Sequence, residues 1–284
     1  MKLAKWWFVI VAAVLCLAAG TALAADKAEA LQQASEKLES VANESQLREM
    51  ADKVGLFKDA GLSYQPSLVV PVEGVVGCKD NEQLRILMGM YTFDANYALL
   101  FGKKQAFAAA YEQINGIPGR LNLRGRLKFK IFTPDELKQV LDNPDDPANH
   151  VRYIKYTAAN YHDMVEASNS DREILALLLD AGYGAAIEGL FVSSKLALAA
   201  GTGPKLVALF NEQAARLDRV YQAMEAYAGD PELLALTKRS QHEPLLKSAI
   251  EILKTKKGNL AEADVVKILS LIEPVRSEVV SKCE

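Results

Sequence analysis

The chain has 284 residues, of which 50% are apolar and 24% are charged, with 17 glycines and 10 prolines. This composition excludes disordered, collagen-like and low-complexity proteins. The 33 basic and 36 acidic residues give a net charge of −3 and are spread along the sequence. A general affinity for nucleic acid is therefore not expected.

Residues 1–24 have the features of a signal peptide. Two lysines precede an uncharged apolar run over residues 6–17, and an Ala-x-Ala pattern ends at Ala24, where we expect cleavage. The mature protein would then comprise residues 25–284, lie in the periplasm or outside the cell, and keep no transmembrane span. An uncleaved anchor is the alternative, because about 20 uncharged residues suffice to span a bilayer.

Cleavage changes the charge and the cysteine count. Loss of two lysines leaves 31 basic against 36 acidic residues, a net charge of −5, and loss of Cys16 leaves only Cys78 and Cys283. An exported protein can form a disulfide between this pair, and the chain-entropy model gives so long a link roughly 5 kcal/mol at most. Two unpaired thiols are the alternative, since sequence alone carries no geometry.

The first half of the mature chain is expected to be mainly helical. Apolar residues at three- and four-residue steps predict a helix over residues 28–60. Prolines and β-branched pairs over 63–77 predict an extended connector. A second helix is expected over 81–115, and it is apolar nearly all round, as is typical of a central helix. Apolar and charged residues then alternate, so residues 118–132 are predicted to form a small β-hairpin insertion.

The second half continues the helical pattern. The sequence Ser170-Asp171-Arg172-Glu173 resembles a capping box and opens another helix that is apolar all round. A transmembrane position for that helix would place three charged residues in the span, at about 2.5–3.5 kcal/mol for each central Asp or Lys, so a buried position is favoured. In all, helices are expected over residues 134–141, 147–166, 171–200, 204–228, 231–257 with a division at Pro244, and 260–282.

These elements predict an all-α fold. We expect a single-domain multi-helix bundle over residues 25–284, with the apolar helices 81–115 and 171–200 at its centre and amphipathic helices around them. No linker rich in Ser, Gly or Pro divides the chain, and no repeat of 20 to 50 residues is evident.

Common catalytic and metal-binding signatures are missing from the sequence. It has no Gly-rich phosphate loop, no H-E-x-x-H and no C-x-x-C motif. His150 and His162 fall about 120° apart around one helix, so they do not form a ligand pair. Nothing suggests a Ser-His-Asp or Cys-His arrangement. We therefore assign no catalytic residue, no metal and no cofactor.

Carboxylates inside the two apolar helices are the most informative residues. An acidic group among core side chains needs a partner or loses its charge. Asp94 is flanked at i−3 and i+3 by Tyr91 and Tyr97. On the other apolar helix, Asp180 and Glu188 lie eight residues apart. The candidate ligand-binding residues are Tyr91, Asp94, Tyr97, Asp180, Tyr183 and Glu188.

Two interpretations of these carboxylates stay open. Gly184 falls between Asp180 and Glu188 on one stripe, where it leaves space either for a ligand or for close backbone contact. In the first case the carboxylates bind a cation, an amine or a polar ligand, or act as acid and base. In the second they form a buried network that fixes helix register, with Tyr, Asn, Arg85 or Arg172 as partners.

A basic segment is the other unusual feature. Five positive charges fall within eleven residues and have apolar residues between them, a pattern that suits contact with anionic lipid, a cell-wall polymer or an acidic partner. A solvated hairpin face is the alternative. The candidate contact residues are Arg120, Arg124, Arg126, Lys128 and Lys130.

Segments 89–97, 101–105 and 186–191 resemble helical motifs of a group of exported all-helical bacterial proteins of uncharacterised function. The resemblance covers about 30 residues and does not include the basic segment. It implies export and a helical fold but no activity. It also implies that one site contains Tyr91, Asp94, Tyr97 and Glu188.

Taken together, the sequence favours an exported, non-catalytic helical protein that binds a small ligand or an envelope protein through a cleft between its central helices. A carboxylate-based enzyme, with or without a metal, is one alternative. A structural scaffold of a cell-envelope complex is the other. Nucleic acid is not an expected partner.

Overall fold

A computed structural model describes residues 36, 38–39, 58, 61–72, 77–200, 204–227, 230–237, 243–256 and 259–281. Every regular element in this part of the chain is a helix, so the all-α prediction is confirmed. The elements are η1 (Pro66–Leu68), α3 (Asn81–Leu100), α4 (Lys104–Arg120), α5 (Pro134–Asp142), α6 (Pro147–Ser168), α7 (Arg172–Ala200), α8 (Pro204–Ala226), α9 (Pro231–Leu236), α10 (Glu243–Lys256) and α11 (Glu262–Ser281).

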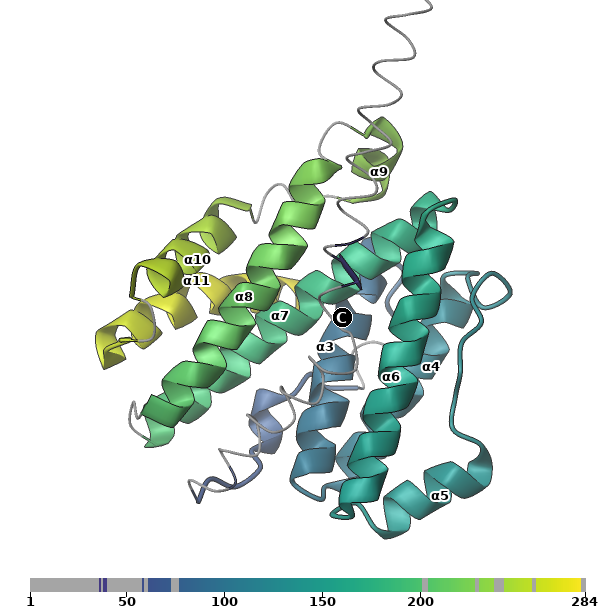
Figure 1. The fold of residues 1–284 in the computed structure, drawn as a ribbon, viewed down its shortest axis with the longest axis horizontal. Helices are drawn as coiled ribbons and strands as arrows, with labels where there is room; N and C mark the ends of the chain where they lie inside the picture. Colours follow the sequence, from purple (N-terminus) through teal and green to yellow (C-terminus); the bar gives the residue numbers. More distant parts are fainter. Residues whose placement is uncertain are drawn as a thin grey trace, which may run out of the picture.

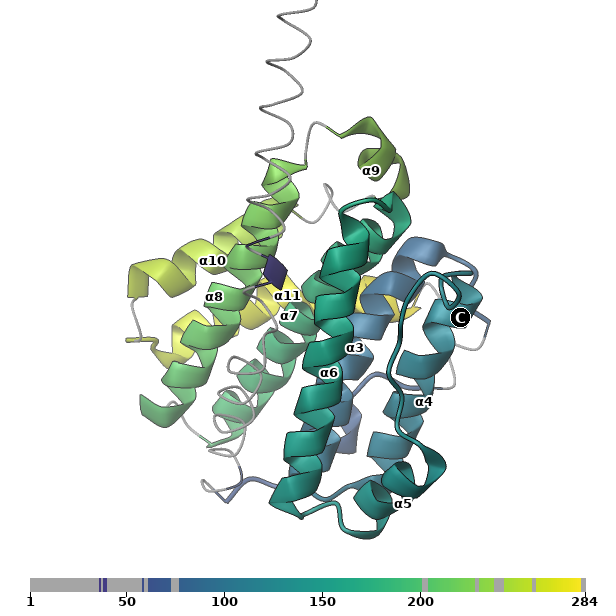
Figure 2. The same cartoon turned by 45° about the vertical axis from the view of Figure 1, so that its right-hand side comes forward.

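Helices α3 and α7 pack against each other and are buried along most of their length. On one side of this pair, α4 packs on α3 and α6 packs on α7, with α5 beyond α4 (Figure 1). On the other side, α8 and α11 pack on α7, and α10 packs on both (Figure 2). This arrangement suits helices that are apolar all round, because the neighbouring helices keep their faces away from water.

The α3–α7 crossing depends on two glycines. A Cβ added to Gly89 of α3 would lie 1.8 Å from the carbonyl oxygen of Ala181 in α7. Conversely, a Cβ added to Gly184 of α7 would lie 2.0 Å from the carbonyl oxygen of Ile86 in α3. The two backbones are therefore in contact, and only a residue without a side chain fits at either position. The suggestion that Gly184 leaves space for a ligand is wrong, since the α3 backbone fills that space.

The single helix expected over 81–115 is two helices. Gly102 adopts φ +65°, its N–H donates to the Leu99 oxygen at 3.0 Å, and the Lys103 N–H donates to the Ala98 oxygen at 2.8 Å. This pair of bonds is the Schellman arrangement that ends many helices. The helix end expected at residue 115 is also wrong, because α4 continues through Pro118 to Arg120.

The β-hairpin predicted over residues 118–132 is not formed. These residues are all described, and none is a strand: α4 ends at Arg120, and residues 121–133 form an irregular strap. Its first part is closed by local turns, in which the Leu123 N–H donates to the Pro118 oxygen at 2.8 Å and the Arg126 N–H donates to the Leu123 oxygen at 2.9 Å. Side chains bind the backbone of its second part. Asn160 of α6 accepts from the Lys130 N–H at 2.7 Å and donates to the Lys130 oxygen at 2.8 Å, and the Phe132 N–H donates to the Tyr111 hydroxyl at 2.7 Å.

Local capping signals do position the helices that follow. The Thr133 hydroxyl accepts from the Glu136 N–H, and the Glu136 carboxylate accepts from the Thr133 N–H, so the predicted capping box at the start of α5 is confirmed. Asp146 caps α6 through its side chain, which accepts from the N–H of Ala148 at 2.9 Å. Both helices begin at a proline, whose missing N–H is no loss at a helix start.

Three sequence predictions fall on parts of the chain outside the described residues. They are the signal peptide, most of the 28–60 helix, and Cys283 as partner of Cys78. The Gln83 side-chain amide donates to the Val279 oxygen, so the end of α11 lies near the start of α3. The Cys78–Cys283 bond stays a prediction.

Candidate functional site

A buried ion pair joins α7 to α11. Arg276 donates to both carboxylate oxygens of Glu188, at 2.7 and 2.8 Å, and to the main-chain oxygen of Leu68 at 2.9 Å. Its guanidinium also stacks over the Phe191 ring, 4.1 Å from the centroid. Glu188 is fully buried and Arg276 is 9% exposed. Such a paired geometry is what allows two charges to be held inside a core.

Asp94 of α3 completes this cluster. Its Oδ2 accepts from the Val70 N–H at 2.9 Å, and its carboxyl group lies beside that of Glu188. Burial, followed by the negative charge of Glu188, raises the pKa of Asp94 well above its usual value. We therefore assign the proton to Asp94, which donates it to Glu188. A neutral Asp94 beside a Glu188–Arg276 pair leaves the buried cluster without net charge.

Tyr91 and Tyr97, which flank Asp94 in the sequence, hold the same segment. The Tyr91 hydroxyl donates to the Pro71 oxygen at 2.9 Å, and the Tyr97 hydroxyl accepts from the Gln65 N–H at 3.2 Å. Together with Asp94, they fasten residues 61–72 along α3. Outside η1, the connector predicted for that region is thus an extended stretch, and side chains of α3 bind the backbone of Gln65, Val70 and Pro71.

Asp180 belongs to a different cluster from Glu188. Its Oδ2 accepts from Arg85 Nε at 2.8 Å, with both side chains buried, and Arg85 also donates to the Leu236 oxygen. Arg85 was among the partners expected from the sequence, whereas Arg172 instead pairs with Asp230 at 3.1 Å. Tyr183 is fully buried on α7. The structure therefore brings Asp94 and Glu188 together but separates Asp180 from them.

The proton on Asp94 makes stability depend on pH. Between about pH 4, where an unfolded aspartate titrates, and the higher pKa of the folded protein, the folded chain holds a proton that the unfolded chain releases. Stability therefore falls as pH rises through that window. Asparagine copies the protonated side chain, because it accepts from Val70 and donates to Glu188, and it does not titrate.

We expect Asp94→Asn to gain stability relative to the wild type as pH rises, and the two proteins to be closest near pH 4. Urea unfolding at intervals from pH 4 to pH 8 measures the difference. A difference that is constant with pH would show that Asp94 is ionised in the folded protein.

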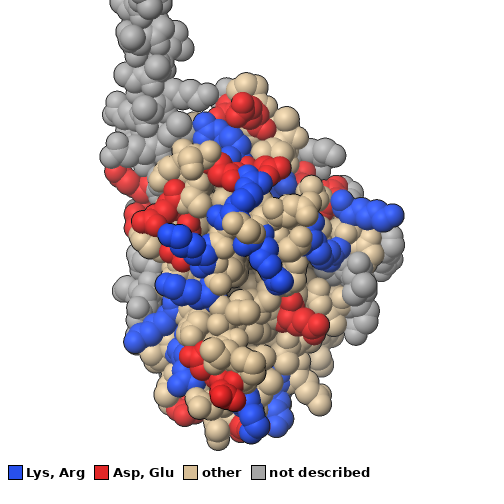
Figure 3. Space-filling view, turned by 90° about the vertical axis from the view of Figure 1, so that its right-hand side faces the viewer, with Lys and Arg blue, Asp and Glu red and all other residues tan. Residues whose placement is uncertain are grey.

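The basic segment is only partly free to contact a partner. Arg120 donates to the Cys78 oxygen, and Arg124 donates to the Asn115 oxygen at 2.7 Å. Lys128 and Lys130 have exposed side chains. Figure 3 shows the face that carries this strap, where Lys and Arg side chains are interspersed with acidic ones and surround an uncharged area.

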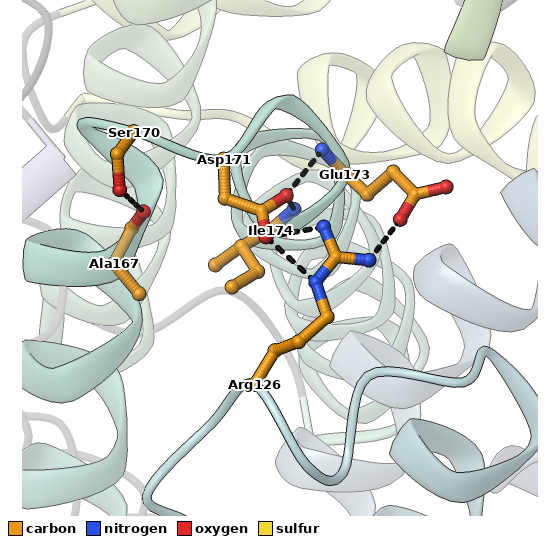
Figure 4. A network of polar contacts seen from close by, with 6 residues as sticks. All are labelled: Arg126, Ala167, Ser170, Asp171, Glu173 and Ile174. Atoms are coloured by element: carbon orange, nitrogen blue, oxygen red, sulfur yellow. Dashed lines mark hydrogen bonds and ion pairs between the residues drawn. The ribbon is translucent and has the colours of Figure 1, made fainter.

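Arg126 attaches the strap to the start of α7. Its guanidinium donates to Asp171 and Glu173 at the start of that helix, as Figure 4 shows. The Asp171 carboxylate in turn accepts from the backbone N–H groups of Glu173 and Ile174. Asp171 therefore caps α7, and not Ser170 as the capping-box pattern predicted, since the Ser170 hydroxyl donates to the Ala167 oxygen.

A cavity of about 100 Å³ lies beside the α3–α7 pair and is lined by these helices, α4, α6 and the strap. None of the six candidate ligand-binding residues lines it. Its wall includes Met88 and Met164, the small residues Ala181, Gly182 and Ala185 of α7, and a set of aromatic side chains. The aromatic members are Phe93, Tyr111, Phe129, Tyr153, Tyr156 and Tyr161.

Several polar groups around this cavity already have partners. The Tyr156 hydroxyl donates to Glu136 at 2.9 Å, and the Thr92 hydroxyl donates to the Met88 oxygen at 2.8 Å. The Tyr111 hydroxyl and both polar atoms of the Asn160 amide bind the strap backbone. The aromatic faces, and not these hydroxyls, are consequently what the wall offers to a molecule inside.

Sequence reasoning missed this cavity. Three tyrosines of α6, at positions 153, 156 and 161, follow helical spacing and gave a detectable signal. It also missed Arg276 as the partner of Glu188. That arginine follows Ile272 by four residues and therefore lies on the apolar stripe of α11.

Two further features of the described residues bear on function. Within the described residues, no three His, Cys, Asp or Glu side chains are grouped so as to hold a metal ion. One described helix, α7, is long and apolar enough to cross a membrane, but 89% of its most apolar stretch is buried among other helices of the chain. Comparisons with protein-family models, curated proteins and solved structures find no match to this chain.

Proposed function

We propose that this chain is an exported, non-catalytic protein that binds a small, mainly apolar molecule in the cavity between α3, α4, α6, α7 and the strap, here called the aromatic cavity. The observation that carries the proposal is the cavity itself, with its aromatic wall and hydroxyls turned to other partners. Ligand sites are typically concave and apolar with a few polar groups. Export rests on the signal-peptide pattern of residues 1–24.

The carboxylates are less suitable as the binding site. The Asp94–Glu188–Arg276 cluster is neutral as assigned, and its members bind one another and the 61–72 segment. Asp180 is paired with Arg85. A buried network whose groups have partners within the protein supports a structural role, as in the second interpretation of the sequence.

The size of the aromatic cavity limits the ligand. An apolar cavity of about 150 Å³ is known to admit benzene, so a volume of about 100 Å³ accommodates part or all of one small ring. Aromatic pairs in edge-to-face or offset geometry add about 0.5–1.5 kcal/mol beyond the area that they bury. A single-ring aromatic compound is the simplest molecule that uses such a wall.

Toluene is therefore the first probe. We expect the mature protein to give a saturation-transfer NMR signal to toluene and to melt at a higher temperature in its presence, because a ligand that binds only the folded state stabilises it. Ala185→Phe, which places a ring inside the aromatic cavity, should lower the affinity at least tenfold. Ala199→Phe, at an exposed position on the same helix, should leave the affinity unchanged.

A second variant guards against a folding defect. Thr157→Leu narrows the aromatic cavity from α6, whereas Ala185 lies on α7. If either variant is folded by circular dichroism and binds toluene as the wild type does, the aromatic cavity is not the site. Absence of toluene binding to the wild type would equally overturn the proposal.

A further inference from the structure

The aromatic cavity has a charged side chain at its edge. Lys130 of the strap lines the cavity and has an exposed side chain, so it lies where the cavity meets the surface. Its backbone is held on both sides by the Asn160 amide, at 2.7 and 2.8 Å. Within the described part of the chain, no carboxylate forms an ion pair with the Lys130 ammonium.

Glu136, whose carboxylate binds Tyr156 of the cavity wall, already has hydrogen-bond partners within the protein. Glu136 accepts from the Thr133 N–H and hydroxyl and from the Tyr156 hydroxyl, and these bonds, with the nearby charge of Arg152, lower its pKa. The Glu136 carboxylate thus binds the residue that caps α5. An anion that binds at Lys130 would therefore meet an ammonium group that forms no ion pair with a carboxylate of the described residues.

Resting on the proposed function, we propose that the ligand is a small aromatic carboxylate, with its ring in the aromatic cavity and its carboxylate on the Lys130 ammonium. The apolar wall selects the ring, and the ammonium at the edge selects a negative end that remains partly in water. A charge-assisted hydrogen bond from an ammonium is stronger than one between neutral groups.

The same residues favour a carboxylate over a phosphate. A phosphate carries up to two charges and is usually bound by arginine forks or by several backbone N–H groups at a helix start. The cavity wall contains one lysine and no arginine among the described residues. A single ammonium matches the single charge of a carboxylate.

Benzoate and benzamide test the proposal, because they have nearly the same shape and differ in charge. By isothermal titration, we expect the wild type to bind benzoate at least tenfold more tightly than benzamide at low salt, and the difference to shrink as salt is added. In Lys130→Met the two affinities should become equal. In Lys128→Met, a change at an exposed position of the same strap that does not line the cavity, the preference should persist.

The outcomes distinguish a failure of the Lys130 proposal from a failure of the proposed function. Equal binding of benzoate and benzamide to the wild type, or a benzoate preference retained by Lys130→Met, would overturn the role of Lys130 while toluene binding still supports the aromatic cavity. If neither compound nor toluene binds, the aromatic cavity itself is not a site. Tighter binding of phenyl phosphate than of benzoate would also contradict the carboxylate assignment.

Discussion

Gly89→Ala and Gly184→Ala are each expected to destabilise the protein by about 3 kcal/mol or more, the upper end of the range for overpacking. The added methyl carbon would lie 1.8 Å from the Ala181 oxygen in the first case and 2.0 Å from the Ile86 oxygen in the second. Those oxygens are backbone atoms of regular helices, so no side chain can rotate to make room. The helices must separate, and contacts along both are weakened.

Gly116→Ala is the matched control for the glycine prediction. Gly116 lies within α4, is exposed, and has nothing within 4 Å of an added Cβ. Replacing a helical glycine with alanine in open space stabilises a helix by up to about 1 kcal/mol. Urea unfolding of the three variants should therefore give opposite signs at the crossing and at the control. A gain in stability at Gly89 or Gly184 would mean that the α3–α7 backbones are not in contact.

Local rules predicted the helices whose ends depend on neighbouring residues. The box formed by Thr133 and Glu136 positions α5, and the proline after Asp146 positions α6, within two residues of the expected bounds. The helix end at Gly102 was not predicted, although a glycine there is the same kind of local signal. A glycine followed by two lysines is a helix-stop signal, but the strongly apolar residues on its N-terminal side favoured one long helix.

The strap shows why a period-two pattern does not always give a strand. Leu121, Leu123 and Leu127 are buried and the charged residues between them are exposed, as in a half-buried strand. A strand also needs a neighbouring strand for its backbone groups. In this chain, residues 121–127 form local turns whose N–H groups donate to backbone oxygens a few residues earlier. Only Lys130 and Phe132, farther along the strap, bind side chains of α6 and α4, and the sequence pattern contains no information about such distant partners.

The candidate site was likewise predictable from the sequence only in part. The importance of Asp94 and Glu188 followed from their chemistry, because acids in apolar helices require partners. Their pairing did not follow, since Arg276 is 88 residues beyond Glu188 and acts only through the packing of α11 on α7. The aromatic cavity was still less predictable, because it arises from four helices and the strap, and no one of them encloses it.

Glu188→Gln should destabilise the protein by about 3–5 kcal/mol, the cost of removing one partner from a buried ion pair. Arg276, 9% exposed, would keep its charge and its contacts with the Leu68 oxygen and the Phe191 ring, but it would exchange the carboxylate for weaker contacts to the glutamine amide. For a protein of this size, that loss corresponds to a fall in melting temperature of roughly 6–20 °C. Differential scanning calorimetry near pH 7 measures it.

The same two helices provide the control for this prediction. Glu273 of α11 pairs with Lys195 of α7 at 2.9 Å, but both side chains are about one-third exposed or more. Glu273→Gln should cost less than about 1 kcal/mol, because water screens an exposed pair. Equal losses from Glu188→Gln and Glu273→Gln would show that water reaches the Glu188 pair. The double variant Glu188→Gln with Arg276→Met should recover part of the loss, since it leaves no buried charge without a partner.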